Sequence, residues 1–523
     1  MSNGKRRGLL ALLLLAALLL SACGAPAPGG ESGEKPAPLL RHTPEPVPAP
    51  EIGELSLPEL PAGTAEDQPL REACARVWAA EKAGDCRVEG DLAMQPLTLT
   101  LLDTEKLSEG LDTRVNELLA ERVAQAASPE EVYGEDRAYR PEILREAYER
   151  ALGERLERAE DYCRQESAEL LLHYADGAWT AEDLSVLCPD LPEDAALYAA
   201  VTAAPEYVPF HYTVEENALC GPVPDESRFL VTDDPAEVEA LLETEEARRL
   251  IGEQSLVWNP ELELFPGSKL RCYLDETILC IVWQEVEARE VGTFSEIIVS
   301  DPSQLRRKIS GDVLWSFEFR TASRFAQEAN AVLALGGDFY YHGRACGIGV
   351  YQRELYRFEP WTCDNCYITS SGDMLFTYRG QILDQGEAEQ FIRDNDVLFS
   401  LCFGPVLIDD GVDVTPESYP WGEVQDEYAR SALGMLGPLH YLTMNLNHGE
   451  GEYYYLATLR QEADAMIKRG CVKAYALDGG QTATTVFHGQ LVNPVQFGWE
   501  KDISDVIYFC TALPSPAGTE TEP

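Results

Sequence analysis

The sequence predicts an α+β protein whose C-terminal half is rich in short strands. Between residues 250 and 512, brief apolar runs are separated by turn residues, as expected for strands joined by loops. Two stretches of this half, 388–394 and 456–469, have the spacing of amphipathic helices. With 523 residues, of which 45% are hydrophobic, the chain can form two or more folded cores. The runs expected to form strands are 270–273, 278–283, 296–299, 332–335, 374–378, 406–408, 440–446 and 506–509.

The first 22 residues have the features of a signal peptide. Basic residues at 5–7 precede an apolar stretch, 9–20, which is too short to span a membrane as a helix. The tetrapeptide at 20–23, Leu-Ser-Ala-Cys, resembles the lipoprotein box of bacteria. It implies cleavage after residue 22 and lipidation of the Cys23 sulfur, with an uncleaved anchor as the alternative. Because several acyl chains hold a protein firmly, we expect a lipid-anchored protein on the extracytoplasmic face of the cell membrane.

Residues 23–65 are expected to be a tether that starts at the lipidated cysteine. Proline, glycine, alanine and glutamate dominate residues 24–61, which contain few side chains suited to a core. Such a proline-rich segment is extended and semi-rigid, so it would hold the folded part away from the membrane. At the other end, residues 513–523 are expected to be a disordered tail.

Residues 66–200 are interpreted as a small, helix-rich α+β module without a catalytic signature. A hairpin is expected over residues 169–180. The module would act as a spacer or as a docking domain for a partner, and residues 201–249 would connect it to the strand-rich domain at 250–512. Helical spacing is found over 70–82, 107–127 and 142–165, the last of these beginning after Pro141.

The charge balance excludes two classes of partner. The chain has 90 acidic and 41 basic side chains and a formal net charge of -49. Surfaces that bind nucleic acids or anionic membranes need clustered lysine and arginine. We therefore expect no nucleic-acid partner, and membrane contact only through Cys23.

Cysteine usage leaves several alternatives open. Of the 14 cysteines, one is the expected lipid attachment site, and disulfides are possible outside the cytoplasm. Cys363 and Cys366 have the spacing of half a zinc site, but no second pair of ligands follows nearby. A loop disulfide or free thiols fit that motif better than zinc. Local disulfide candidates are Cys74 with Cys86 and Cys272 with Cys280.

One carboxylate at the end of an apolar run has the most informative surroundings in the chain. Asp478 follows Ala476-Leu477 and precedes Gly479-Gly480, after which three threonines occur within four residues. Glycine lets a ligand approach the backbone closely, and threonine favours a following strand. Asp478 is therefore expected in a tight turn surrounded by hydroxyl groups and amides. A plain hairpin turn would use the same residues.

Three further motifs precede this turn in the chain. They are Ala334-Leu335-Gly336-Gly337-Asp338-Phe339-Tyr340, Phe403-Gly404-Pro405-Val406-Leu407, and Tyr428-Ala429-Arg430-Ser431-Ala432-Leu433-Gly434. In this order the four motifs resemble the phosphodiester glycosidase family, whose pattern is roughly A-I-N-G-x-F-Y, F-G-P-x-L, A/P-R-T-A-I-G and N-L-D-G-G-x-S/T. The resemblance covers about residues 250–512 and implies an α+β domain that hydrolyses sugar-phosphate diesters.

The sequence departs from that pattern at four places. Gly336 and Ala476 stand where the family commonly has asparagine, and Ser431 stands where it has threonine. Lys501 and Asp502 occupy a region where many relatives have an arginine. The lost amide and guanidinium groups would suit an altered specificity, or a domain that binds a glycan without cleaving it.

The resemblance also implies roles for individual residues. Arg430 would clamp the phosphate with its planar fork of donors, and Asp478 would stabilise the sugar cation or activate water. Asp338 is the candidate for a second carboxylate. Because the protein is acidic, an anionic substrate needs local cations, which Arg430, Lys473 and Lys501 or a bound divalent cation would supply. The expected substrate-binding groups are Gly479, Gly480, Thr482, Ser431 and His440, with His488 as a further candidate at the leaving group.

Two functions from different classes follow. The first is a membrane-tethered hydrolase acting on sugar-1-phosphodiester linkages in cell-wall or exopolysaccharide glycans. The second is a catalytically degenerate lipoprotein that binds glycans or scaffolds the envelope. Gly336 and Ala476 favour the second function, whereas Arg430, Asp478 and the glycine pair favour the first.

Overall fold

The computed structural model describes most of the chain and confirms the α+β class. It describes residues 47–58, 63–134, 136–188, 193–215, 218–313, 316, 318–338, 346–420, 424–449 and 456–516. The expected signal peptide, Cys23, most of the tether and the end of the tail lie outside these residues. Within them, no helix is both apolar enough and long enough to cross a bilayer.

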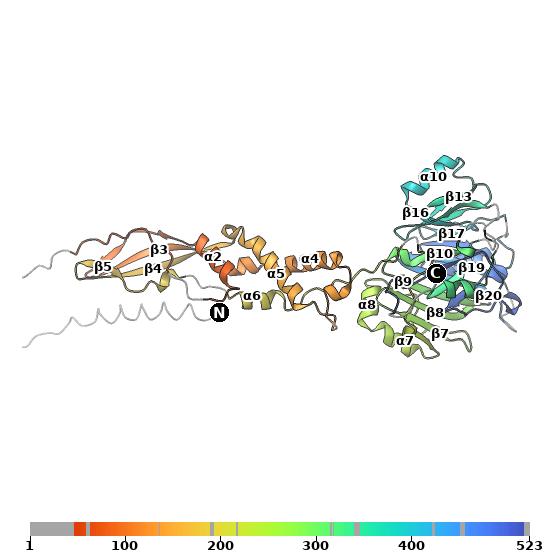
Figure 1. The fold of residues 1–523 in the computed structure, drawn as a ribbon, viewed down its shortest axis with the longest axis horizontal. Helices are drawn as coiled ribbons and strands as arrows, with labels where there is room; N and C mark the ends of the chain where they lie inside the picture. Colours follow the sequence, from red (N-terminus) through yellow and green to blue (C-terminus); the bar gives the residue numbers. More distant parts are fainter. Residues whose placement is uncertain are drawn as a thin grey trace, which may run out of the picture. The chain divides into compact units, whose positions relative to one another are not determined.

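The chain divides into two compact units, which are described separately (Figure 1). Unit 1 comprises residues up to 111 together with 152–200, and unit 2 comprises residues 112–151 together with 201–523. The three positions at which the assignment changes lie within helices α4 (Leu111–Gln125), α5 (Pro141–Leu156) and α6 (Asp194–Val201).

Unit 1 is built on the long antiparallel pair β3–β4. The pair runs in register from Leu92 opposite His173 to Leu102 opposite Cys163. Alternate residues of β3, such as Leu97 and Leu99, are buried, as expected for a strand with one face on a core. The elements are α2 (Gln68–Val77), β1 (Ala79–Lys82), β2 (Arg87–Glu89), β3 (Leu92–Leu102), α3 (Thr104–Ser108), β4 (Cys163–Ala175), β5 (Ala178–Ala181) and α6 (Asp194–Val201).

Three of the helices expected in the first 200 residues have different limits. The expected helix 70–82 ends at Val77, and its last residues form β1. The expected helix 107–127 is divided at Gly110, whose φ of 70° is left-handed. The expected helix 142–165 ends at Leu156, and β4 begins at Cys163. The hairpin expected at 169–180 corresponds to the β4–β5 pair.

In the part of unit 2 that the structure describes, two sheets pack face to face. The large sheet has the order β18-β17-β21-β19-β20-β9-β8-β7-β6, and the small sheet has the order β10-β24-β11-β22-β23. All eight runs that were expected to be strands are strands here. The strands of the two sheets are β6 (Phe229–Thr232), β7 (Leu270–Leu274), β8 (Ile278–Glu287), β9 (Glu290–Val299), β10 (Leu305–Ile309), β11 (Leu333–Gly336), β17 (Val406–Asp409), β18 (Val412–Asp413), β19 (Arg430–Gly437), β20 (His440–Asn447), β21 (Lys473–Leu477), β22 (Thr485–Phe487), β23 (Gln490–Leu491) and β24 (Asp505–Phe509).

Helices cover the outer faces of both sheets. One face of the large sheet packs on the small sheet, through residues such as Leu433, Leu477 and Ile507. Its other face packs on α7 (Pro235–Leu242), α8 (Glu245–Ile251) and α11 (Leu459–Lys468), while α9 (Ala322–Glu328) covers the small sheet. The architecture is therefore helix, sheet, sheet, helix. A further layer is formed by β12 (Gly347–Tyr351), β13 (Glu354–Glu359), β14 (Asn365–Thr369), β15 (Met374–Thr377), α10 (Gln385–Asp394) and β16 (Val397–Leu401) (Figure 1).

A buried cluster of charges joins these layers. The Arg307 guanidinium, on β10, lies 2.6 Å from the Asp505 carboxylate on β24 and 3.3 Å from that of Asp338 after β11. It also donates a 2.8 Å hydrogen bond to the Ser400 carbonyl on β16. Burial alone would lower the pKa of Arg307, but the carboxylates of Asp505 and Asp338 raise it well above its usual range. The cluster therefore contains a permanent positive charge.

Removal of this charge should destabilise the fold. The Arg307→Met substitution leaves the buried Asp505 carboxylate without its counter-ion and leaves Asp338 with Arg357 alone, and such losses amount to about 3–5 kcal/mol. We expect a fall of that size in the free energy of unfolding, measured by urea titration. The matched control is Arg324→Met, which removes an exposed pair with Glu328 and should change stability by less than about 1 kcal/mol. Equal losses in the two variants would contradict this interpretation of the cluster.

Candidate active site

The turn that contains Asp478 contacts the start of β19. Asp478 directly follows β21 and is partly exposed, whereas the last four residues of that strand are buried. The Gly480 amide donates a 2.8 Å hydrogen bond to the Ala429 carbonyl. A Cβ atom at Gly479 would lie 2.3 Å from the same oxygen, so only glycine permits this approach. The glycine pair thus places Asp478 beside Arg430.

The first motif contacts the far side of the same turn. The Gly336 amide, at the end of β11, donates to the Thr484 carbonyl at 3.2 Å. A Cβ atom at Gly336 would lie 2.2 Å from the Thr482 carbonyl oxygen. This contact leaves no room for an asparagine side chain, which explains in physical terms one departure from the family pattern. The Thr482 hydroxyl donates to the Gly479 carbonyl at 2.7 Å and so stabilises the turn itself.

Asp338 connects the first motif to the Phe-Gly-Pro motif. One carboxylate oxygen accepts a 2.7 Å hydrogen bond from the Cys402 amide, and the other lies 3.6 Å from Arg357 as well as close to Arg307. Two residues beyond Cys402, the Gly404 amide donates to the Ala476 carbonyl at 3.1 Å. The Asp338 side chain is 0% exposed. In this arrangement Asp338 positions the loop beside β21, and its direct role as a second catalytic carboxylate stays a prediction.

Arg430 lies next to Asp478 across two neighbouring strands. Ser431 on β19 pairs with Leu477 on β21, and Arg430 and Asp478 are each one residue beyond that pair. The Arg430 guanidinium donates to the carbonyls of Ala457 and Asp426 at 2.8 and 2.7 Å. It forms no ion pair with any residue that the structure describes. Its predicted role as a phosphate clamp also stays a prediction.

A buried carboxyl group without a hydrogen-bond partner interacts electrostatically with Arg430. Glu462, on α11, is 1% exposed, and neither of its carboxylate oxygens has a hydrogen-bond partner. Burial raises the pKa of Glu462 to about 8, although the positive charge of Arg430 acts in the opposite direction. Glu462 is therefore mostly protonated at neutral pH and leaves the charge of Arg430 available to an anion.

A row of buried polar side chains, of which the sequence reasoning identified only Ser431, lies on the large sheet beside the turn. The row crosses four strands in register: Ser431, Asn445, Thr293 and Gln284. The Asn445 amide donates to the Thr485 hydroxyl at 2.5 Å, while the Ser431 hydroxyl and the Asn445 carbonyl oxygen have no partner. Buried polar atoms without partners are uncommon away from functional sites. The available signal was the pair of asparagines at alternate positions of β20, within an otherwise apolar strand.

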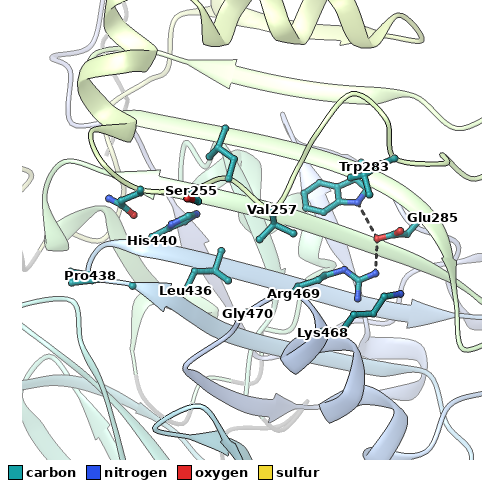
Figure 2. A pocket seen from close by; sticks show the side chains of 14 residues that line it. Ser255, Val257, Trp283, Glu285, Leu436, Pro438, His440, Lys468, Arg469 and Gly470 are labelled. Carbon is teal, nitrogen blue, oxygen red and sulfur yellow. Dashed lines mark hydrogen bonds and ion pairs between the residues drawn. The ribbon is translucent and has the colours of Figure 1, made fainter.

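The structure does not bring His440 to Asp478. His440 begins β20 beside Gly437, at the far end of β19 from Arg430, and the length of β19 corresponds to about 23 Å. Its ring nitrogen lies 2.8 Å from the buried carboxylate of Glu296. It lines a separate pocket of about 670 Å³ together with Arg469, and Figure 2 shows the side chains that line this pocket.

Two further candidates are also held elsewhere. Lys473, at the start of β21, forms a 2.7 Å ion pair with Asp373. His488, in the β22–β23 turn, lies 2.6 Å from Glu226, with its ring stacked on Phe229. Neither side chain lies at the Asp478 turn.

The structure corrects the local disulfide candidates. The described cysteines are all free thiols. Cys272 and Cys280 belong to the cores on opposite faces of the large sheet, so they cannot approach each other. Cys363 and Cys366 also pack into these two separate cores. Among the described residues, no cluster of three or more histidine, cysteine or acidic side chains is arranged to hold a metal ion.

The comparison with family models agrees with this geometry. Residues 330–510 match the model of the family described as phosphodiester glycosidase, and this interval contains all four motifs. The similarity to this family rests on that sequence match, and the comparison with curated proteins found no match.

Solved structures show a more distant similarity to this chain. The catalytic domain of zebrafish N-acetylglucosamine-1-phosphodiester alpha-N-acetylglucosaminidase, auto-inhibited by its pro-peptide, is 18% identical. The match covers 45% of this chain and 82% of that chain, with a TM-score of 0.35. A hypothetical protein from Synechocystis is 14% identical, over 45% and 62% of the two chains, with a TM-score of 0.35. A putative exported protein from Burkholderia pseudomallei is 13% identical, over 42% and 74%, with a TM-score of 0.31.

The contact at Gly479 generates a testable expectation. In Gly479→Ala, the new methyl group collides with the backbone of Ala429, which cannot give way as a flexible side chain would. We expect a loss of stability of about 1–3 kcal/mol, as for overpacked interiors, measured by thermal unfolding. The control is Gly437→Ala, where an added Cβ meets no atom within 4 Å. A Gly479→Ala protein as stable as the control would refute the close contact.

Proposed function

We propose that the protein is a lipid-anchored extracytoplasmic hydrolase that cleaves sugar-1-phosphodiester linkages in cell-wall or exopolysaccharide glycans. The observation that carries the proposal is the adjacency of Asp478 and Arg430 at neighbouring strand ends, inside the segment that matches the family. The four motifs are far apart in the sequence, yet hydrogen bonds or close backbone contacts connect all of them. The anchor is supported by the apolar segment and the lipoprotein box at the N-terminus.

The proposed chemistry needs few groups. Water attacks the anomeric carbon, the bond from that carbon to the phosphate oxygen breaks, and the products are a reducing sugar and a phosphate monoester. Phosphate is a good leaving group, so it needs less protonation than the leaving group of an ordinary glycoside. Asp478, which is partly exposed, would stabilise the sugar cation or accept the proton of the attacking water. Arg430 would attract the phosphate.

The surroundings of Arg430 solve an electrostatic problem. A net charge of -49 repels an anionic substrate at long range. The buried acid that interacts electrostatically with Arg430, however, is Glu462, which is mostly protonated at neutral pH because its pKa is about 8. Protonated Glu462 therefore does not neutralise the charge of Arg430, which can attract the phosphate within an acidic protein.

A glycan-binding protein without catalysis is the second candidate. It is favoured by the hydrogen bonds of Arg430, which already satisfy two backbone carbonyls, and by the complete burial of Asp338. In that case Asp478 would contact sugar hydroxyls without promoting hydrolysis.

Substitution of Asp478 separates the two candidates. We expect the protein to release reducing sugar from an N-acetylglucosamine-1-phosphodiester and from teichoic-acid fragments. Each assay is repeated with EDTA, which tests whether a divalent cation is needed. Asp478→Asn should lower kcat about 100-fold or more, in the range for loss of a general base. Asp502→Asn, at an exposed acid of the same matched segment, is the control and should keep full activity. Glycan binding without any release of sugar by the unmodified protein would favour the second candidate.

Glu462 should make the protein sensitive to alkaline pH. Its pKa is raised in the folded state to about 8 from an ordinary value of 4.5, so the folded state binds more protons between these values. Stability from this group is present at low pH and is lost as pH rises through the folded pKa. We expect Glu462→Gln to abolish this part of the loss, measured by urea unfolding between pH 5 and 9.

The same titration should affect substrate binding. Above about pH 8 the ionised Glu462 neutralises the field of Arg430, so KM for the anionic substrate should rise in the unmodified protein. In Glu462→Gln, KM should change less with pH. If the pH dependence of stability and of KM were the same in the unmodified protein and in Glu462→Gln, the role given to Glu462 would be contradicted.

A further inference from the structure

Two aromatic side chains are exposed on a loop beside the candidate active site. The loop contains the short 3₁₀ turn η9 (Gln496–Gly498), with Phe497 71% exposed and Trp499 60% exposed. No ring contact of either side chain occurs among the described residues. Large apolar side chains gain by burial, so two neighbouring aromatic rings left in solvent suggest a binding surface.

Hydrogen bonds hold this loop against the Asp478 turn. The Gln481 side chain, in the turn η8 (Gly480–Thr482), donates a 3.1 Å hydrogen bond to the Trp499 carbonyl. On the other side, the Glu500 carboxylate accepts hydrogen bonds from the backbone amide and the hydroxyl of Ser323, at 2.9 and 2.6 Å. The two rings therefore project from an anchored segment. This segment is hydrogen-bonded to Gln481, which is in the same turn as the proposed catalytic carboxylate of Asp478.

The backbone of the loop is also unusual. Phe497 has φ of 66° and ψ of 5°, which is the left-handed region that bulky residues rarely adopt. Glycine or asparagine would adopt this conformation more easily. Strain of this kind concentrates at functional sites. It has the effect of presenting a large ring to solvent between Gln496 and Gly498.

We propose that Phe497 and Trp499 form an aromatic platform that stacks against sugar rings of the glycan next to the scissile phosphodiester. Sugar rings have faces of C–H groups, and the electron-rich faces of aromatic rings attract such partial positive charge. This contact uses no formal charge, so it is compatible with the acidity of the protein. Nucleic-acid bases could also stack, but their phosphate backbone would be repelled. The proposal rests on the proposed function, because it identifies the substrate as a glycan longer than one sugar.

The experiment compares a short and a long substrate. The short one is the methyl phosphodiester of N-acetylglucosamine, and the long one carries the same linkage within an N-acetylglucosamine oligosaccharide. Trp499→Leu and Phe497→Leu remove the aromatic face but keep an apolar side chain, whereas Trp499→Phe keeps a ring. We expect the leucine variants to lower the ratio of kcat/KM for the long substrate to that for the short one about tenfold, in line with loss of an aromatic contact. Trp499→Phe should restore most of the ratio.

A binding measurement distinguishes failure of the platform from failure of the proposed function. Binding of the oligosaccharide to the Asp478→Asn protein is followed by calorimetry, with Val231→Ala, at a 56% exposed residue on β6, as a remote control. If the unmodified protein cleaves neither substrate, the proposed function fails, and a roughly tenfold weaker binding in Trp499→Leu still supports the platform. The platform would be overturned if both leucine variants kept the ratio of kcat/KM between the long and short substrates and also kept their binding. An equal loss of binding in Val231→Ala would overturn it as well.

Discussion

The buried contact of Arg307 with Asp338 and Asp505 is the interaction on which the site depends. It joins β10, β24 and the end of β11, and it extends to β16 through the Ser400 carbonyl. Burying three charges is unfavourable unless each is compensated, so the cluster favours the arrangement of these elements in which the charges are paired. Asp338, fixed in this way, holds the Cys402 amide and thereby the loop that pairs with β21. The position of Asp478 is thus determined by charges that are themselves closed to solvent.

The two candidate carboxylates consequently have different environments. Asp338 is enclosed by two guanidinium groups and an amide, whereas Asp478 is partly exposed at the end of a central strand. Glycine at 336 and at 479 lets three backbone segments meet within van der Waals distance around the Asp478 turn. A carboxylate that acts on the sugar needs access to it, whereas a carboxylate that fixes the geometry can be fully buried. The structure assigns the reachable position to Asp478.

Much of this arrangement could be predicted from the sequence, and the reason lies in local patterns. Apolar runs such as 278–283 and 440–446 are strands in the structure. A short run of apolar residues between turn residues is a local pattern that predicts a buried strand. The role of Asp338 could not be predicted, since its partner Arg307 is 31 residues away and Asp505 is 167 residues away. His440 lies away from Asp478 for a related reason. It is close to Arg430 in the sequence, but the two residues lie at opposite ends of the extended strand β19.

The charge distribution connects the site to the rest of the protein. An acidic surface favours solubility but opposes an anionic substrate, so the site must produce its positive potential locally. Arg430 alone would lose that potential if a buried acid beside it were ionised. Glu462 avoids this loss because its complete burial, without a hydrogen-bond partner, keeps it protonated near neutral pH. Desolvation of one carboxyl group therefore maintains the field of the neighbouring cation. The aromatic loop at 496–499 complements this arrangement, because stacking adds affinity for neutral sugar rings without requiring further charge.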